Sequence, residues 1–209
     1  MMFVIQEKTT PMNDSVLHVI VTVLGRAIHL RRLIDCFYLQ TAGNWVLHII
    51  HDGPASVDVI AVMSAYRDPR ILFECTPQVN GFWGHPNREY GLRKLILNHY
   101  DYVLITNDDN MYVPAFVEYF MKECRKPNVG FVYCDTVHSY MGYSILKTQI
   151  KENYIDMGSF IVKIDVAKKV GFRHRHLSAD GTYAVECANY CRQRKLSLVP
   201  IPKPLFIHC

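Results

Sequence analysis

The stretch Tyr102-Val103-Leu104-Ile105-Thr106-Asn107-Asp108-Asp109-Asn110 joins an apolar run directly to a cluster of polar side chains. Such a run is typical of a buried strand in a mostly parallel sheet. Open α/β sheets bind ligands beyond the carboxyl ends of their strands, which is where Asp108 and Asp109 fall. A hard divalent cation that also holds phosphate oxygens would neutralise this carboxylate pair. The competing interpretation is a polar turn that caps the helix expected from Pro114.

Strand and helix patterns alternate along the first two thirds of the chain. Runs of β-branched and apolar residues predict strands, and apolar residues at helical spacing predict helices. The expected strands cover residues 16–23, 45–51, 70–75, 102–106 and 129–134, and the expected helices cover 26–40, 57–66, 87–98 and 114–125. This order predicts an α/β fold, a single domain in which helices flank a mostly parallel central sheet on both faces.

The last third of the chain is less regular. Residues 135–153 hold few long apolar runs, and we expect them to wrap over the edge of the sheet. The remaining expected elements are a strand over 157–163, helices over 165–170 and 179–194, a last strand over 196–201 and an extended tail over 202–209.

Composition narrows the class of protein. A chain of 209 residues holds one domain with a substantial core. Seven cysteines, odd in number and scattered through apolar segments, indicate reduced thiols and therefore a cytoplasmic protein. No apolar run is long enough to span a bilayer, and no secretory signal is recognised at the start. The net charge of +4 suits an anionic small molecule and is too weak and dispersed to indicate a nucleic-acid partner.

Several familiar nucleotide motifs are missing. The chain has no GxxxxGK[ST] phosphate loop, no GxGxxG after its first strand and no GxSxG elbow. A protein that binds phosphate without a glycine loop needs another source of positive charge. A metal ion together with arginine meets that need most simply.

Polar residues recur at the carboxyl ends of successive predicted strands, which the topology brings to one edge of the sheet. They are Gly25 and Arg26, Asp52 and Gly53, Arg88, and Asp108 with Asp109. An Asp-Gly turn alone is common. Four such positions in register predict a ligand site for an anionic molecule.

These residues resemble the motifs of the GT-A-fold nucleotide-sugar glycosyltransferases, close to the inverting group called family 2. The matching segments are 19–26 (VIVTVLGR), 51–54 (HDGP), 88–92 (REYGL), 106–114 around the DXD motif, and 179–181 (ADG). The resemblance spans about residues 16–208. Asn107 stands where many relatives have the first Asp of DXD, Glu89 replaces an Asn and Pro54 replaces a Ser. A narrower resemblance, to N-terminal modules of multidomain glycosyltransferases of large algal viruses, implies further domains and a host-cytoplasm location.

The resemblance implies a metal-dependent inverting transfer from a nucleotide diphosphate sugar, most simply a UDP-sugar, to a hydroxyl of a glycan or glycoprotein acceptor. Residues 1–110 would form the nucleotide-binding half and 111–209 the acceptor-binding half. Asp180 would be the catalytic base, and Mn²⁺ or Mg²⁺ would bind Asp109 and His208. The donor would contact Thr22, Leu24, Gly25, Arg26, Asp52, Arg88, Asp108, Asp156 and Gly158.

Particular roles follow for these side chains. Asp52 would accept the uracil N3–H, and Asp108 would contact ribose or a metal-bound water. Arg26 and Arg88 would neutralise the diphosphate, because a guanidinium fork grips phosphate oxygens at two points. Gly158 would let the backbone approach the donor sugar.

Each of these residues also has a simpler explanation. Asp52 and Asp156 fit solvated turns, and the two arginines fit helix surfaces. Asp180 fits a helix N-terminus, and His208 fits an ordinary chain end. Two rival functions also stay open: a sugar-nucleotide nucleotidyltransferase, for which Gly25-Arg26 is a poor match to the expected glycine-rich loop, and a non-catalytic nucleotide-sugar-binding module of the same fold.

Overall fold

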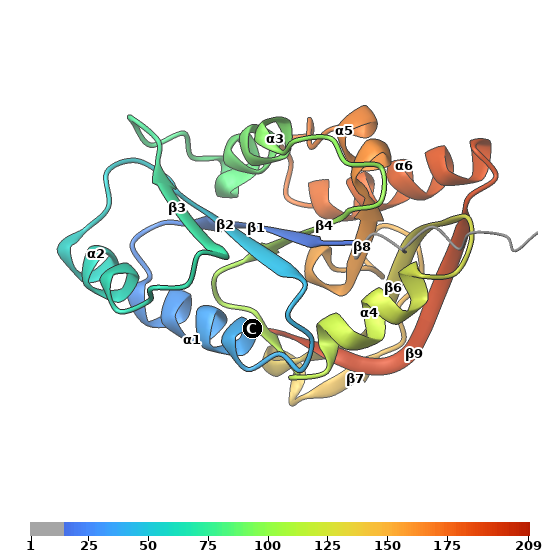
Figure 1. Cartoon of the computed structure of the whole chain (residues 1–209), viewed down its shortest axis with the longest axis horizontal. Helices are drawn as coiled ribbons and strands as arrows, with labels where there is room; N and C mark the ends of the chain where they lie inside the picture. The colour runs from blue at the N-terminus through green and yellow to red at the C-terminus, as the bar shows by residue number, and fades with distance from the viewer. Residues whose placement is uncertain (1–14) are drawn as a thin grey trace, which may run out of the picture.

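A computed structural model describes residues 15–209 (Figure 1). Within this range one nine-stranded sheet runs through the molecule in the order β3-β2-β1-β4-β8-β6-β9-β5, with a further strand paired to β6. Its first part is parallel and consists of β1 (Leu17–Val23), β2 (Trp45–His51), β3 (Ile71–Cys75) and β4 (Tyr102–Asn107). Apolar side chains fill β1 and β4 because both faces of these strands are covered.

The second part of the sheet is mixed. The strand β8 (Phe160–Lys163) runs antiparallel between β4 and β6 (Val129–His138), and β9 (Ser197–His208) runs parallel to β6. Two short strands, β5 (Met111–Tyr112) and β7 (Ser144–Leu146), pair antiparallel with β9 and β6. The predicted sheet is therefore parallel where strands and helices alternate and becomes mixed after β4.

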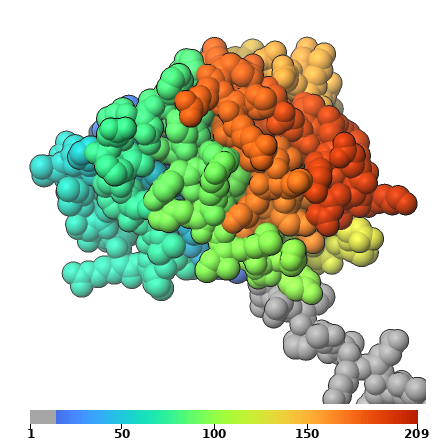
Figure 2. All heavy atoms as spheres, turned by 90° about the horizontal axis from the view of Figure 1, so that it is seen from above, coloured from blue at the N-terminus to red at the C-terminus, as the bar shows by residue number. Residues whose placement is uncertain are grey.

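Helices cover both faces of the sheet (Figure 1). On one face lie α1 (Ala27–Tyr38), α2 (Val57–Ser64) and α4 (Phe116–Cys124), and on the other lie α3 (His85–Lys94), α5 (Ile164–Val170) and α6 (Ala179–Gln193). Figure 2 looks onto the second of these faces, where α3 lies beside α5 and α6. Each layer buries its own apolar cluster against the sheet. The predicted α/β fold with helices on both faces is confirmed.

The end of the chain differs from the sequence prediction. Residues 202–208 continue β9 instead of forming a separate tail. The strand predicted over 196–201 is present, but its continuation was not predicted, because Pro202 and Pro204 cannot donate hydrogen bonds to a sheet. The pairing of β9 with β6 absorbs them through register shifts on both sides of Asp135. As a result, β9 brings His208 opposite His138.

Two further expectations need correction. Residues 135–153 do not simply wrap over the edge, since they complete β6, a 3-10 turn η2 (Ser139–Met141) and β7. The strand predicted over 157–163 begins with a 3-10 turn, η3 (Met157–Ser159), before β8. No helix in the described part of the chain has both the length and the apolar content that a bilayer crossing requires.

Candidate functional site

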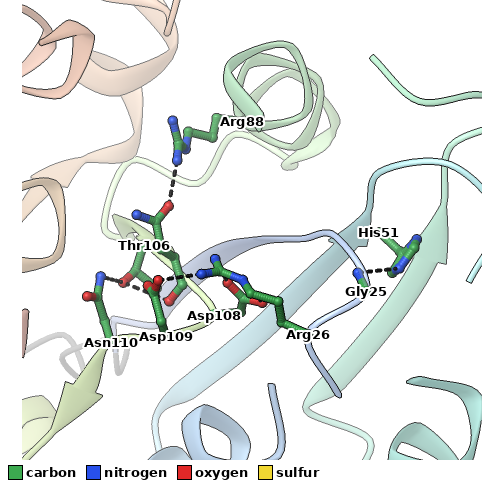
Figure 3. A network of polar contacts seen from close by, with 9 residues as sticks. Gly25, Arg26, His51, Arg88, Thr106, Asp108, Asp109 and Asn110 are labelled. Carbon is green, nitrogen blue, oxygen red and sulfur yellow. Dashed lines mark hydrogen bonds and ion pairs between the residues drawn. The ribbon is translucent and has the colours of Figure 1, made fainter. Parts of the chain in front are cut away.

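The Asp108-Asp109 pair lies where β4 ends and is bound by one arginine. Nη1 of Arg26 donates to Asp109 at 2.6 Å, while its Nε and Nη2 atoms donate to the two oxygens of Asp108. Figure 3 shows Arg26 reaching from the turn after β1 to both carboxylates. The helix-cap interpretation is wrong, because α4 begins after Ala115 and has no side-chain cap.

Burial makes this pair electrostatically unusual. Asp108 is fully buried, and this burial raises the pKa of its carboxyl to about 6, against the opposing effect of Arg26. The Asp109 charge adds to the increase. Burial lowers the pKa of Arg26, but the two aspartates outweigh it and leave that pKa raised. Arg26 therefore stays charged and neutralises much of the carboxylate pair.

A second arginine approaches the same strand end from the opposite face. Arg88, on α3, is 3% exposed and donates from Nη2 to Asn107 at 2.5 Å (Figure 3). Its Nη1 contacts His85, while Nε is buried without a partner among the described residues. Burial lowers the pKa of Arg88 to about 10, opposed by the charges of Asp180, Asp156 and Asp109. Arg88 is thus a buried cation with a donor still unused.

Asp52 is not a solvated turn residue, since it is 3% exposed. Its carboxylate accepts hydrogen bonds from the backbone N–H groups of Asn80 and Gly81 at 2.7 and 3.0 Å, and from the side chain of Asn87 at 2.9 Å. A carboxylate has about four acceptor positions, so one remains for a ligand. Asp52 consequently holds the loop that precedes α3 against the end of β2.

That loop adopts an uncommon backbone. Phe82 and Trp83, in the 3-10 turn η1 (Phe82–Gly84), have φ angles of 49° and 53°, which bulky residues rarely adopt. A side chain at Gly84 would lie 2.7 Å from the hydroxyl of Thr22, so only glycine fits there. The loop thereby presents Trp83, 62% exposed, at the edge of a cavity.

This first cavity has a volume of about 380 Å³ and lies at the ends of β1, β2 and β4. Its lining residues are Thr22, Val23, Leu24, Arg26, Asp52, Gly81, Trp83, Gly84, Arg88 and Asn107. Two arginines face it, which suits an anionic ligand. Gly25 lies in the adjoining turn, where its N–H donates to Nε2 of His51 at 3.2 Å.

A second cavity, of about 600 Å³, is formed by residues of the second half of the chain. It is lined by His138, Tyr140, Leu146, Asn153, Ile155, Asp156, Leu177, Ser178, Asp180 and His208. Asp156 joins the two predicted site segments of the second half, because its Oδ2 atom pairs with Nδ1 of His208 at 2.8 Å. Burial lowers the pKa of His208, but the bond to Asp156 and the nearby Asp109 and Asp180 charges raise it overall.

Asp180 lies in the first turn of α6, where it does not cap the helix; the N-cap position belongs to Ser178. Burial raises the pKa of Asp180, Asp156 adds to the increase, and the Gly181 N–H bond and Arg88 oppose it. A partly buried carboxyl with a raised pKa facing a cavity has the properties of a general base.

Gly158 has a packing reason to be glycine. A side chain there would overlap the ring of Phe206 and lie 2.8 Å from the hydroxyl of Tyr112. The backbone of this turn is held by Asp156, which accepts the Gly158 N–H at 3.0 Å. Gly158 therefore lets β9 pack closely beneath the site.

Asp109 and His208 carry the donor atoms that could hold a divalent cation. Within residues 15–209 no three His, Cys, Asp or Glu side chains lie close enough to hold a metal unaided. Asp109 nevertheless has a buried oxygen, Oδ1, without a partner in the described chain. The Asp156 bond to Nδ1 orients His208, as carboxylates do for metal-binding imidazoles. These donors fit a Mg²⁺ or Mn²⁺ ion that takes its other ligands from a bound phosphate.

The structure collects the predicted residues around two adjoining cavities. Thr22, Leu24, Arg26, Asp52 and Arg88 line the first, and Asp156, Asp180 and His208 line the second. The sequence interpretation missed Asn80 and Asn87, which hold Asp52, and His138 and Tyr140, which lie beside His208. Their signal was weak, because the loop and the β6–β9 pairing bring them to the site from far along the chain.

Known proteins resemble this chain in structure, not in sequence. The sequence matches no protein-family model and no curated protein. The structure of S. aureus TarS residues 1–349 is similar, with a TM-score of 0.70 at 11% identity over 92% of this chain and 60% of that one. The mannosyltransferase PcManGT of Pyrobaculum calidifontis, in complex with GDP-Man and Mn²⁺, has a TM-score of 0.70 at 14% identity over 95% and 58%.

TarS residues 1–349 have also been solved in complex with UDP-GlcNAc, and that structure matches with a TM-score of 0.69 at 11% identity over 92% of this chain and 58% of that one. The chain thus has the GT-A fold. It spans about three fifths of the length of these neighbours.

Proposed function

We propose that this protein is a glycosyltransferase that moves a sugar from a nucleotide diphosphate sugar, most simply a UDP-sugar, to an acceptor hydroxyl with inversion. One observation carries the proposal. Arg26 and Arg88 line one cavity, Asp156 and Asp180 line the other, and the charges of Asp109, Asp156 and Asp180 all act on the buried guanidinium of Arg88. Neighbours of the same fold that bind UDP-GlcNAc or GDP-Man support it.

The first cavity suits the nucleotide diphosphate. The unpaired Nε of Arg88 supplies a buried donor for a phosphate oxygen, and Arg26 supplies a charged guanidinium at the opposite wall. The one free acceptor position of Asp52 matches the imide N–H of uracil. Trp83 offers an exposed aromatic face on which a base or sugar would stack.

The nucleotidyltransferase alternative lacks support. That chemistry would need a glycine-rich loop to hold a triphosphate, whereas the turn after β1 is fixed by one bond from Gly25 to His51. The arginine-lined cavity instead adjoins a carboxylate-lined one, as sugar transfer to a hydroxyl requires.

A divalent cation would be held by Asp109 and His208. When bound it would supply Lewis acidity toward the departing diphosphate. Arg26 donates to Oδ2 of Asp109, and Oδ1 of Asp109, unpaired in the described chain, would be the oxygen left for the ion. Asp108, buried and paired with Arg26, would position Arg26 and would not touch the ion.

Asp180 would act from the second cavity. The acceptor oxygen attacks the anomeric carbon, the bond from that carbon to the diphosphate oxygen breaks, and the hydroxyl proton passes to the Asp180 carboxylate. Asp156 holds His208 in place on the same side. The division into a donor half over residues 1–110 and an acceptor half over 111–209 is part of this proposal, as is a glycan acceptor.

Thermal unfolding with UDP, GDP and their sugar conjugates, each with and without Mn²⁺, tests the donor site. Binding to the folded state raises Tm by mass action, and a ligand at 100 times its Kd adds about 2.7 kcal/mol. We expect the largest increase when nucleotide and Mn²⁺ are both present, with a smaller one for Arg88→Lys. No shift with any nucleotide diphosphate would overturn the proposal.

A further inference from the structure

The second cavity has a charge character unlike that of the chain as a whole. The chain carries a net charge of +4, yet none of the described residues that line this cavity is Lys or Arg. Two of them are carboxylates, Asp156 and Asp180. Asp156 is paired with Nδ1 of His208 at 2.8 Å, whereas Asp180 accepts only the Gly181 N–H within the described residues. An anionic ligand would therefore meet uncompensated negative charge at Asp180.

The cavity also carries an exposed aromatic ring that is held in place. Tyr140 is 63% exposed, but its hydroxyl shares hydrogen bonds with Nδ1 of His138 at 2.5 Å and with Nδ1 of His208 at 3.5 Å. Its ring stands at 83° to the His138 ring and at 88° to the His208 ring. An exposed tyrosine normally moves between rotamers. These contacts instead hold Tyr140 ready for a ligand.

His138 has an unused polar atom in the same wall. It is 8% exposed, and its Nε2 atom is buried without a hydrogen-bond partner in the described part of the chain. Its other ring nitrogen, Nδ1, is hydrogen-bonded to the Tyr140 hydroxyl, so Nε2 is the nitrogen left for a ligand. A buried polar atom left unpaired is costly, and a ligand hydroxyl would supply the missing partner.

We propose that the second cavity binds a neutral saccharide, with an apolar face of the sugar ring on Tyr140 and a hydroxyl on His138. This rests on the proposed transfer function and names the acceptor class for it. Leu177, 78% exposed, and Ile155 extend the apolar surface next to Tyr140. Sugars present alternating apolar C–H faces and hydroxyl edges, which match this combination of ring, aliphatic groups and single polar atoms.

The role of Asp180 as the base disfavours an acceptor that carries a positive charge. Asp180 must be free to take a proton from the acceptor hydroxyl, and an ammonium group bound to Asp180 would hold it in an ion pair. Asp156 is already engaged by His208 and by the Gly158 N–H. The cavity therefore favours neutral sugars over both phosphorylated and amino sugars.

Matched monosaccharides test the inference. The probes are the methyl glycosides of glucose, galactose, mannose, xylose, rhamnose and fucose, together with glucuronide, glucose 6-phosphate and glucosamine. Binding is measured by saturation-transfer NMR on the full chain with UDP and Mn²⁺ present. Acceptor-dependent release of UDP from UDP-sugars is measured in a separate assay with Mn²⁺. We expect signals from neutral glycosides, and weaker ones from the charged analogues.

Single substitutions show whether the NMR signal arises from binding in the second cavity. Tyr140→Ala should weaken neutral-sugar binding roughly two- to twelvefold, because an aromatic contact contributes roughly 0.5–1.5 kcal/mol. Tyr140→Phe keeps the ring but loses its hydroxyl bonds, so it should fall in between. Tyr100→Ala removes a ring of similar exposure, 59%, outside this cavity and should change nothing. Leu177→Lys should shift the preference toward glucose 6-phosphate.

The results separate this inference from the proposed function. UDP binding and donor hydrolysis with a preference for charged sugars would overturn the inference alone. The inference would also be overturned if no neutral glycoside gave an NMR signal that Tyr140→Ala reduces. Absence of any nucleotide binding would overturn the proposed function instead.

Discussion

The two cavities differ in the charge and pairing of the polar groups that line them. In the first, Asp52 accepts three hydrogen bonds and Arg26 donates to both aspartates, and the buried atom left unpaired among the described residues is Nε of the cationic Arg88. In the second, the buried atom left unpaired within the same range is Nε2 of His138, beside the exposed face of Tyr140. The donor side therefore offers a ligand positive charge, whereas the acceptor side offers an imidazole nitrogen and an aromatic face.

The largest expected effect comes from Asp180, the proposed base in the second cavity. Asp180→Asn keeps size and shape but cannot accept a proton. We expect sugar transfer to fall about 10²- to 10⁴-fold, as for loss of a general base, while UDP binding by calorimetry stays unchanged. Glu186→Gln, on the same helix and paired with His174, is the control and should keep full activity. Unchanged turnover in Asp180→Asn would assign the base to another residue.

Replacing Asp52 in the first cavity should lower the free energy of unfolding and also weaken nucleotide binding. Asp52→Ala leaves two backbone N–H groups and the Asn87 amide without their acceptor. Each unpaired buried donor costs about 1–3 kcal/mol, so we expect unfolding in urea at clearly lower concentration and weaker nucleotide binding. Asp58→Ala, a change in the exposed first turn of α2, is the control. Unaltered stability in Asp52→Ala would show that the loop before α3 is held by other contacts.

Packing beneath the acceptor side should be sensitive to a single methyl group. Gly158→Ala forces Phe206 to move, and overpacking of this kind costs about 1–3 kcal/mol. Gly25→Ala provides the matched comparison on the donor side, because no atom lies within 4 Å of the new methyl and only the φ of 67° is unfavourable. Urea unfolding should therefore show a larger loss for Gly158→Ala. Equal losses would mean that β9 adjusts freely.

The smallest effect is a pH dependence from the buried carboxylate. The pKa of Asp108 is raised to about 6 in the folded state, from 3.8, so the folded protein binds the extra proton. The stabilisation that comes from protonating Asp108 is present at low pH and is lost as the pH rises through 6. The free energy of unfolding should therefore fall by about 1 kcal/mol between pH 5 and pH 7. Asp108→Asn removes this dependence, so the Tm of the wild type should fall relative to the variant by about 2–4 °C over that range. A Tm difference constant with pH would show that Arg26 keeps Asp108 ionised.

Sequence patterns predicted the alternating part of the fold well. The runs at 17–23, 45–51 and 102–107 are apolar because both faces of these strands are covered, and such burial leaves a clear local pattern. The second part of β9, residues 202–208, had no such pattern, since its pairing with β6 depends on register shifts near Asp135. The hydrophobic pattern of one segment contains no information about an irregularity in the strand with which it pairs.

The site shows the same division. The sequence by itself determined the parallel core and the placement of Arg26, Asp52 and Asp108 at the ends of its strands, because a carboxyl-end position follows from strand order alone. Only the tertiary structure decided that Arg26 binds both aspartates, that Asp52 holds the loop before α3, and that His138, Tyr140 and His208 meet beside Asp156. These contacts join segments as far as 83 residues apart. They depend on side-chain direction and burial, which exist only once both layers have packed on the sheet.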